Sequence, residues 1–230
     1  MRVVGEVLQQ PAGDGRIIVA DLAGETPRLA RGTAVPEVAF RAGERDLIPV
    51  AGFQRALDRF FAEAGTALGS YDIAVINAAI PAQGVTSMSE DDARYAVATD
   101  FTAYVLRAHK AAAALGDKGD VILVGSLSAH ILGPDSSIYA GMKAGIAGFA
   151  EALRKELGNK GIKVGLIEPG KTGADFQYPD IPADKQREMI HEETMLRAED
   201  IAVGVHYLLT QPRRAVVQQL TIAPRMQDKE

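Results

Sequence analysis

The chain alternates between short apolar runs and longer segments of helical character, and this alternation constrains the fold more than any other feature. Each apolar run ends in small or polar residues, as the buried strands of a parallel sheet do. The segments between them carry apolar residues at helical spacing or are rich in alanine. Strand–helix–strand alternation predicts an α/β domain with a doubly wound parallel sheet. The predicted strands are Arg16–Asp21, Asp72–Asn77, Val121–Gly125, Lys163–Glu168 and Val216–Ile222, and the predicted helices are Phe53–Ala64, Asp100–Leu115, Ser137–Leu157 and Ala198–Leu209.

Length and composition indicate a single globular domain that spans residues 1–230. Hydrophobic residues make up 47% of the chain and charged residues 24%, which excludes a disordered protein. The net charge of −5 argues against nucleic acid and anionic membranes as partners. The absence of cysteine excludes disulfides and thiolate metal sites. Because no apolar stretch approaches the roughly 20 residues of a membrane span, and the first residues do not read as a signal peptide, we expect a soluble cytoplasmic protein.

The residues that follow the predicted strands are the first candidates for a functional site, because ligands of such sheets bind at the carboxyl ends of the strands. Ser126 follows one strand, and Tyr139 and Lys143 lie on the next predicted helix. Their spacing of four residues places the phenol and the ammonium on one helix face. A nearby cation lowers the pKa of a tyrosine, so this pair is able to exchange a proton with an alcohol oxygen. The Ser126 hydroxyl would hold a substrate oxygen while charge develops on it.

Several motifs resemble the short-chain dehydrogenase/reductase family. Ser126 stands thirteen residues before Tyr139, and Lys143 stands four residues after it, which is similar to the Ser–Tyr–Lys triad of that family. The strand end Asp72–Ala79 is similar to its Asn-Asn-Ala-Gly motif, and Ile167–Gly170 resembles the Pro-Gly turn that opens its substrate loop. Motifs in this order are specific to a family in a way that no single one of them is.

The resemblance covers residues 72–224 and implies a Rossmann-like oxidoreductase that moves a hydride between NAD or NADP and a small alcohol or carbonyl compound. It implies that Tyr139 is the general acid/base, that Lys143 lowers its pKa and binds the nicotinamide ribose, and that Ser126 orients the substrate oxygen. A homodimer or homotetramer, paired through the two long helices, is also implied, and no metal is expected. The implied cofactor-binding residues are Asp21, Asn77, Ala78, Lys143, Pro169 and Gly170.

The N-terminal part departs from the family pattern. The Gly-rich phosphate loop is absent from it, and Arg16–Asp21 resembles the family's second strand. Too few residues precede that strand in this sequence for a strand, a loop and a helix, so we expect the first strand and its loop to be missing or replaced. Residues 1–15 fit a first helix at Arg2–Gln10, which is preferred, or a hairpin of Arg2–Leu8 with Arg16–Leu22. Either removes the backbone N–H groups that hold a pyrophosphate, so cofactor binding is expected to be weak or absent.

This departure leaves more than one function open. The leading interpretation is the oxidoreductase. The alternative is a cofactor-independent isomerase, dehydratase or lyase that uses Ser126, Tyr139 and Lys143 for proton transfer without hydride transfer. A third interpretation is a non-enzymatic partner subunit that contributes only its helix interface.

Other departures lie close to the predicted site. Asp100 stands where the family usually has asparagine, and it is included among the catalytic candidates. Either its carboxylate holds the ammonium of Lys143, or the substitution has no functional effect because the backbone at this position makes most of the contacts. Ala79 replaces the strand-end glycine, and Ala174 replaces the threonine after the Pro-Gly turn. Both of these changes fall on the cofactor side.

Gly170–Leu196 is the longest stretch with little pattern, and residues 171–196 are predicted to form a lid over the substrate. His130 is interpreted as a solvated loop residue outside the catalytic set. His191 and the two glutamates after it do not converge on one helix face, so they are not expected to bind a metal.

Overall fold

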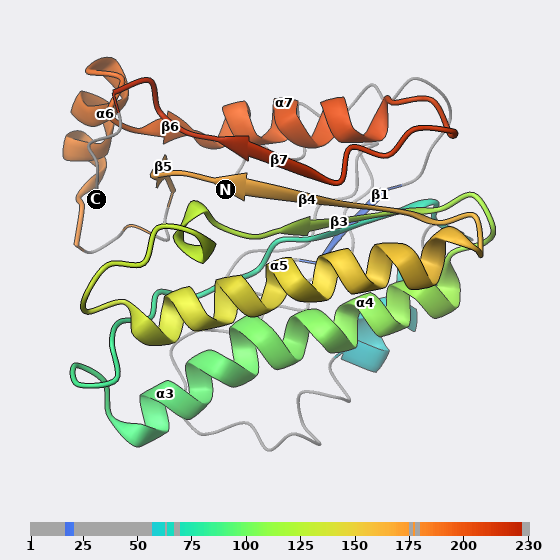
Figure 1. The fold of residues 1–230 in the computed structure, drawn as a ribbon, viewed down its shortest axis with the longest axis horizontal. Helices are drawn as coiled ribbons and strands as arrows, with labels where there is room; N and C mark the ends of the chain where they lie inside the picture. The colour runs from blue at the N-terminus through green and yellow to red at the C-terminus, as the bar shows by residue number, and fades with distance from the viewer. Residues whose placement is uncertain are drawn as a thin grey trace.

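The structure, a computed structural model, describes residues 17–20, 57–62, 64–66, 70–174, 177 and 180–226. Its centre is a five-stranded sheet in the order β1-β2-β3-β4-β7 (Figure 1). All neighbouring strands are parallel, so the predicted α/β fold is confirmed. The strands are β1 (Ile17–Ala20), β2 (Ile73–Ile76), β3 (Asp120–Val124), β4 (Lys163–Pro169) and β7 (Gln219–Ile222).

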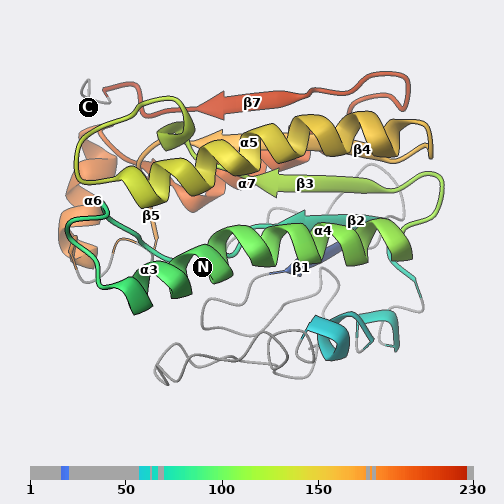
Figure 2. The same ribbon diagram turned by 60° about the horizontal axis from the view of Figure 1, so that its bottom comes forward.

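Helices cover both faces of the sheet. The helices α4 (Ala103–Ala114) and α5 (Ser137–Gly158) lie on one face, and α7 (Ala198–Leu209) lies on the other (Figure 2). Successive side chains of a strand point to opposite faces, so strands buried on both sides are apolar throughout, as β2 and most of β3 are. The layer under α4 and α5 includes Ile76, Leu123, Leu166, Tyr104 and Ile146, and the layer under α7 includes Val75, Ile122, Ile167, Ile201 and Val205.

One helical segment is longer than predicted. In place of Asp100–Leu115, the structure has α3 (Glu90–Val97), a π-helical turn η1 (Ala98–Thr102) and α4 in direct succession. Ser89 caps α3 by accepting a hydrogen bond from the N–H of Asp92 at 3.1 Å, and the acidic first turn suits the helix dipole. Most residues of α3 are exposed, so this segment lacks the apolar periodicity on which the prediction relied.

The helices predicted at Ser137–Leu157 and Ala198–Leu209 are confirmed to within one residue. α7 lies unusually close to the sheet at Gly204, where a Cβ atom would stand 2.6 Å from the terminal methyl groups of Ile167 and Ile222. The last strand begins three residues later than predicted, at Gln219, because Val216 lies in an exposed loop before it.

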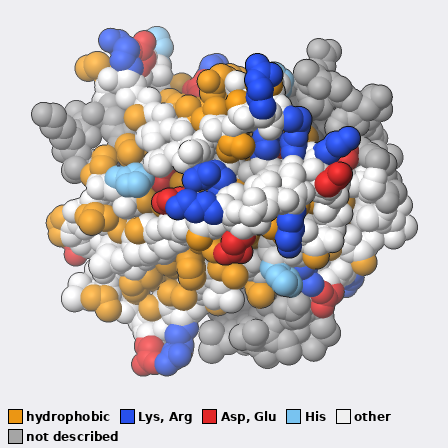
Figure 3. Space-filling view, turned by 45° about the vertical axis from the view of Figure 1, so that its right-hand side comes forward, with side chains coloured by type: hydrophobic (Ala, Val, Ile, Leu, Met, Phe, Trp, Pro, Cys, Tyr) orange, Lys and Arg blue, Asp and Glu red, His pale blue; other side chains and the backbone are white. Residues whose placement is uncertain are grey.

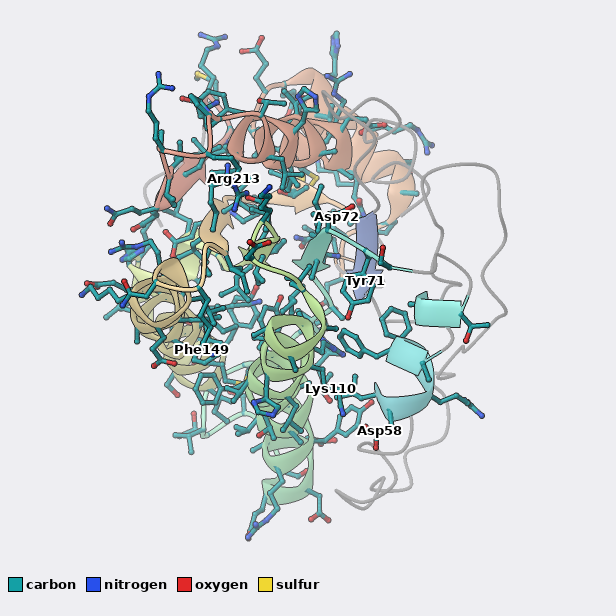
Figure 4. The ribbon with its side chains drawn as sticks, turned by 90° about the vertical axis from the view of Figure 1, so that its right-hand side faces the viewer. Asp58, Tyr71, Asp72, Lys110, Phe149 and Arg213 are labelled. Carbon is teal, nitrogen blue, oxygen red and sulfur yellow. The ribbon has the colours of Figure 1, made fainter. Side chains whose placement is uncertain are left out.

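Part of the predicted N-terminal structure, including residues 1–15 and Asp21, lies outside the described residues. β1 lies within the segment that resembles the family's second strand. It pairs in parallel with β2, the strand that leads to Asn77. The predicted helix Phe53–Ala64 is helical at residues 57–62 and 64–66. An ion pair between Asp58 and Lys110 joins this helix to α4 (Figure 4).

The segment predicted as a lid contains regular structure. α6 (Ala183–His191) lies within it, and β5 (Thr172–Gly173) pairs in parallel with β6 (Leu196–Arg197) at its base. Figure 1 shows α6 beyond the carboxyl end of β4. α6 was missed because it is strongly polar, and Gln186 is its one buried residue.

Charged side chains link the segments at the amino-terminal ends of the strands, opposite the carboxyl ends. The carboxylate of Asp120, at the start of β3, pairs with Arg213 at 2.7 Å and with Lys163 at 3.4 Å. Figure 3 shows basic and acidic side chains together on this side of the molecule. Of the helices in the described ranges, none has the length and apolar character needed to cross a bilayer.

Candidate active site

Ser126 lies two residues after the end of β3, at the carboxyl ends of the strands. Its backbone is extended, and its Oγ accepts a hydrogen bond from the N–H of Ser128 at 3.1 Å. That bond caps a short 3₁₀ turn, η2 (Leu127–Ala129), in which the N–H of Ala129 donates to the carbonyl of Ser126 at 3.0 Å. Ser126 is buried at the start of this turn.

Tyr139 and Lys143 lie in the first two turns of α5, as predicted. The Tyr139 hydroxyl is hydrogen-bonded to the hydroxyl of Ser126. The Nζ of Lys143 stands 5.4 Å from the centroid of the Tyr139 ring, and it is equally far from the ring of Tyr104 on α4. Lys143 is 2% exposed, so its ammonium is held in a protein environment with two aromatic rings. The structure therefore brings the three predicted side chains together.

Asp100 joins this group from η1. Its side chain is fully buried, and its Oδ1 accepts a hydrogen bond from the N–H of Ile80 at 2.8 Å. Its Oδ2 is buried without a hydrogen-bond partner. The π turn displaces one residue from the regular helix ladder, and such turns often occur at functional sites. Asp100 and Lys143 attract each other electrostatically, but no direct ion pair joins these two described residues.

Burial dominates the electrostatics of the site. It raises the pKa of Asp100 to about 6, although Lys143 and Arg107 favour the ionised carboxyl. Burial lowers the pKa of Lys143, and the charge of Asp100 opposes that change. The sequence predicted that Lys143 lowers the pKa of Tyr139, but burial raises that pKa to about 12 despite the hydrogen bond from Ser126. The prediction of a loosened phenol proton is thus wrong for the protein alone, because desolvation of the phenolate outweighs the other effects.

The predicted cofactor residues that the structure describes lie along the same edge. Asn77 and Ala78 follow β2, and Pro169 ends β4. The N–H of Gly170 donates to the carbonyl of Ile222 at 2.7 Å, which ties the turn to β7. The hydroxyl and ammonium donors beside them suit a carbonyl oxygen and ribose hydroxyls, so the site fits the nicotinamide half of a dinucleotide.

The sequence reasoning missed a contact between His130 and Glu168. His130 was expected to be solvated without a partner, but its Nε2 lies 2.9 Å and 3.1 Å from the two carboxylate oxygens of Glu168. Glu168 is fully buried. Its place in an otherwise apolar strand was the available signal, because a buried carboxylate requires a hydrogen-bonding or charged partner. The partner is 38 residues away in the sequence, so only the fold identifies it.

Comparisons with known proteins agree with the fold. A family model described as enoyl-(acyl carrier protein) reductase matches residues 37–222. A dehydrogenase/reductase from Sinorhizobium meliloti 1021 has a similar structure, with a TM-score of 0.65 and 32% identity over 80% of this chain and 72% of that one. A short-chain dehydrogenase from Burkholderia cenocepacia J2315, solved in complex with NADP, has a TM-score of 0.64 and 28% identity over 74% of this chain and 71% of that one.

The curated relatives match a shorter part of the chain. Serine 3-dehydrogenase from Rhizobium radiobacter is 29% identical over 109 residues, which are 46% of this chain and 44% of the relative. An uncharacterized oxidoreductase from Staphylococcus aureus strain USA300 is 32% identical over 106 residues, which are 46% of this chain and 42% of the relative. The chain thus spans less than half the length of these curated relatives. The fold is that of an α/β protein with a doubly wound parallel sheet. The family model and the similar structure show that the chain belongs to the short-chain dehydrogenase/reductase family.

Proposed function

We propose that this protein is an NAD(P)-dependent oxidoreductase that interconverts a small carbonyl compound and its alcohol. The observation that carries the proposal is the hydrogen bond between the Tyr139 and Ser126 hydroxyls, with the Lys143 ammonium beside the Tyr139 ring. Two hydroxyl groups at one point suit one carbonyl oxygen: the Tyr139 hydroxyl, which accepts from Ser126, is able to donate to it, and the Ser126 hydroxyl donates to it once its own proton turns from Tyr139 to the substrate.

Each residue has a defined task in this proposal. The bound nicotinamide supplies the hydride. Ser126 and Tyr139 orient the substrate oxygen, and Tyr139 donates a proton to it as negative charge develops there. Burial raises the pKa of Tyr139 to about 12, so the phenol is protonated at neutral pH and has a proton to donate. Asp100 favours the charged form of Lys143, and in this proposal that ammonium stabilises the phenolate left after proton transfer, whereas the carboxylate of Asp100 by itself raises the pKa of Tyr139.

The cofactor contacts are assigned to the same edge of the sheet. Lys143 lies beside Tyr139, where it would bind the nicotinamide ribose, and the segments 77–78 and 169–170 flank the site on either side of β3. The NADP complex of the Burkholderia relative supports a dinucleotide as the cofactor. We infer a small organic molecule as substrate, and a homodimer or homotetramer as the working form.

The test begins with cofactor binding. The protein is titrated with NADPH and NADH, and nucleotide fluorescence is followed. Carbonyl reduction is then assayed with a panel of small ketones and aldehydes, an enoyl thioester, and L-serine in the oxidation direction. We expect one nucleotide to bind measurably but weakly, as the missing phosphate loop predicts, and we expect a loss of turnover of at least ~100-fold in Tyr139→Phe with little change in nucleotide Kd.

Two outcomes would contradict the proposal. The first is no nucleotide binding at millimolar concentration. If that result is accompanied by Tyr139-dependent exchange of substrate α-protons into deuterated water, the cofactor-independent alternative is favoured instead. The second is turnover that survives in Tyr139→Phe, which would exclude Tyr139 as the general acid/base.

A further inference from the structure

Glu168 is a fully buried carboxylate at the end of β4, next to the start of the Ser126 turn. A Cβ atom on Gly125 would stand 3.2 Å from the Cγ of Glu168, so the side chain lies against the backbone that precedes Ser126. The carboxylate accepts hydrogen bonds from His130 and from the side-chain amide of Gln219 on β7. Among the described residues, no lysine or arginine forms an ion pair with Glu168, so these two side chains are its hydrogen-bonding partners. Removing such a partner from a buried carboxylate is costly.

His130 lies at the other end of the turn that begins with Ser126. The N–H of His130 donates to the carbonyl of Leu127 at 3.0 Å, and this bond closes η2. The turn has only three residues, and 3₁₀ geometry is weak by itself. The imidazole of His130 therefore ties the far end of the turn to β4, while the Ser126 hydroxyl stands at its near end.

The contact between His130 and Glu168, called the tether below, also fixes the orientation of the imidazole. We assign the proton of a neutral ring to Nε2, because an ionised Glu168 carboxylate accepts hydrogen bonds and does not donate them; the amide nitrogen of Gln219 lies 3.3 Å from the same Nε2. The imidazole side chain is 49% exposed, whereas the side chain of its partner is fully buried. An exposed side chain that keeps a single orientation because of a buried acceptor is suited to hold a loop in place.

We propose that His130 and Glu168 form a positioning pair, which fixes the turn η2 so that the Ser126 hydroxyl stays on Tyr139 and on the substrate oxygen. The inference rests on the proposed function and extends it to two residues that act through Ser126. Neither residue is a proton donor to substrate in this assignment. A displacement of about 1 Å in a positioned group is enough to reduce turnover by ~100-fold.

The test uses two substitutions of similar size at position 130. The side-chain amide nitrogen of His130→Gln reaches the place of Nε2 and is able to donate to Glu168, whereas His130→Asn places its amide near Nδ1 and loses that bond. We expect His130→Asn to lower kcat for carbonyl reduction ~10- to 100-fold, with the KM for NADPH unchanged. We expect His130→Gln to keep kcat within about threefold of the parent protein.

Hydrogen exchange gives a second measurement that does not depend on turnover. The amide of Ser128 bonds to Ser126 Oγ, so exchange over residues 126–131, followed by mass spectrometry, reports on the turn. We expect faster exchange in His130→Asn and parent-like exchange in His130→Gln. Normal kcat and normal exchange in His130→Asn, or equal losses in both variants, would overturn the inference. If the parent protein shows no turnover, the proposed function fails, and exchange in the two variants still decides whether the tether exists.

Discussion

Asp100 is an acid that burial keeps from ionising easily, and this has a consequence for stability. Its pKa rises from 3.8 to about 6 in the folded protein. Below about pH 4 the carboxyl is protonated in both the folded and unfolded chain, and its contribution to stability is fully present. That contribution is lost as pH rises through about 6, because the folded protein then contains a buried charge. A shift of this size corresponds to on the order of 3 kcal/mol.

We therefore predict that Asp100→Asn becomes more stable relative to the parent protein as pH rises from 4 to 7. The gain is about 3 kcal/mol, since asparagine is neutral throughout this range. Urea unfolding at several pH values measures it. Asp117→Asn, which changes an exposed carboxyl, serves as the control. A difference between Asp100→Asn and the parent that stays constant with pH would contradict the prediction.

At the scale of residues, the sequence was sufficient for one part of the site. Tyr139 and Lys143 are four residues apart on one helix, so local periodicity places these two on one face, and the resemblance to the family's Ser–Tyr–Lys triad added Ser126. Local periodicity does not reveal contacts between distant segments. The bond between the Ile80 N–H and Asp100, and the contact between His130 and Glu168, depend on how strands and helices pack. The raised pKa of Tyr139 also depends on packing, since burial is its cause.

At the scale of elements, α5 and the turn η1 meet at Gly145. A Cβ atom there would lie 2.9 Å from the ring of Phe101, the residue directly after Asp100. At Gly141, also on α5, a Cβ atom would meet nothing within 4 Å. A glycine-to-alanine substitution at Gly141 therefore tests helix propensity alone, and the same substitution at Gly145 tests helix propensity together with packing.

We predict that Gly141→Ala stabilises the protein by about 0.5–1 kcal/mol, as expected for glycine to alanine within a helix. Gly145→Ala should give no gain or a loss of ~1 kcal/mol, because the ring of Phe101 must move. Denaturant midpoints at one pH measure both. Equal stabilisation by the two substitutions would show that the contact between α5 and η1 adapts without cost.

The element boundaries show where sequence patterns are weak. The ends of α5 and α7 were predictable because both helices bury an apolar stripe against the sheet. α3 and α6 were not, because both are mostly polar and exposed. The π turn between α3 and α4 leaves no sequence signature of its own, although it places Asp100 in the site.

At the scale of the whole molecule, the two edges of the sheet have different tasks. The candidate site lies at the carboxyl ends of the strands, and the Asp120–Arg213–Lys163 network lies at their amino-terminal ends.

We predict that Arg213→Met lowers stability by about 1–2 kcal/mol and leaves kcat unchanged, because it removes only bonds at the end of the sheet that is distant from the site. Thermal unfolding and carbonyl reduction, each compared with the exposed neighbour Arg214→Met, measure the two effects. A lower kcat in a folded Arg213→Met protein would contradict this separation.

The overall architecture was the most predictable feature, because alternating strands and helices admit few arrangements. The parallel order of the sheet and the helices on both faces follow from it. The way in which the first residues would contribute to cofactor binding is not covered by this agreement, since residues 1–16 lie outside the described ranges.

Asp100, Ser126, Tyr139 and Lys143 all lie within one continuous stretch of the chain, which runs from η1 through β3 to the second turn of α5. Under the proposed function, one segment of 44 residues, 100–143, therefore carries all four candidate acid–base groups. Substitutions within it would change the chemistry of the site without any change elsewhere in the chain. A change of reaction on this scaffold would then require substitutions in a single short segment of the chain.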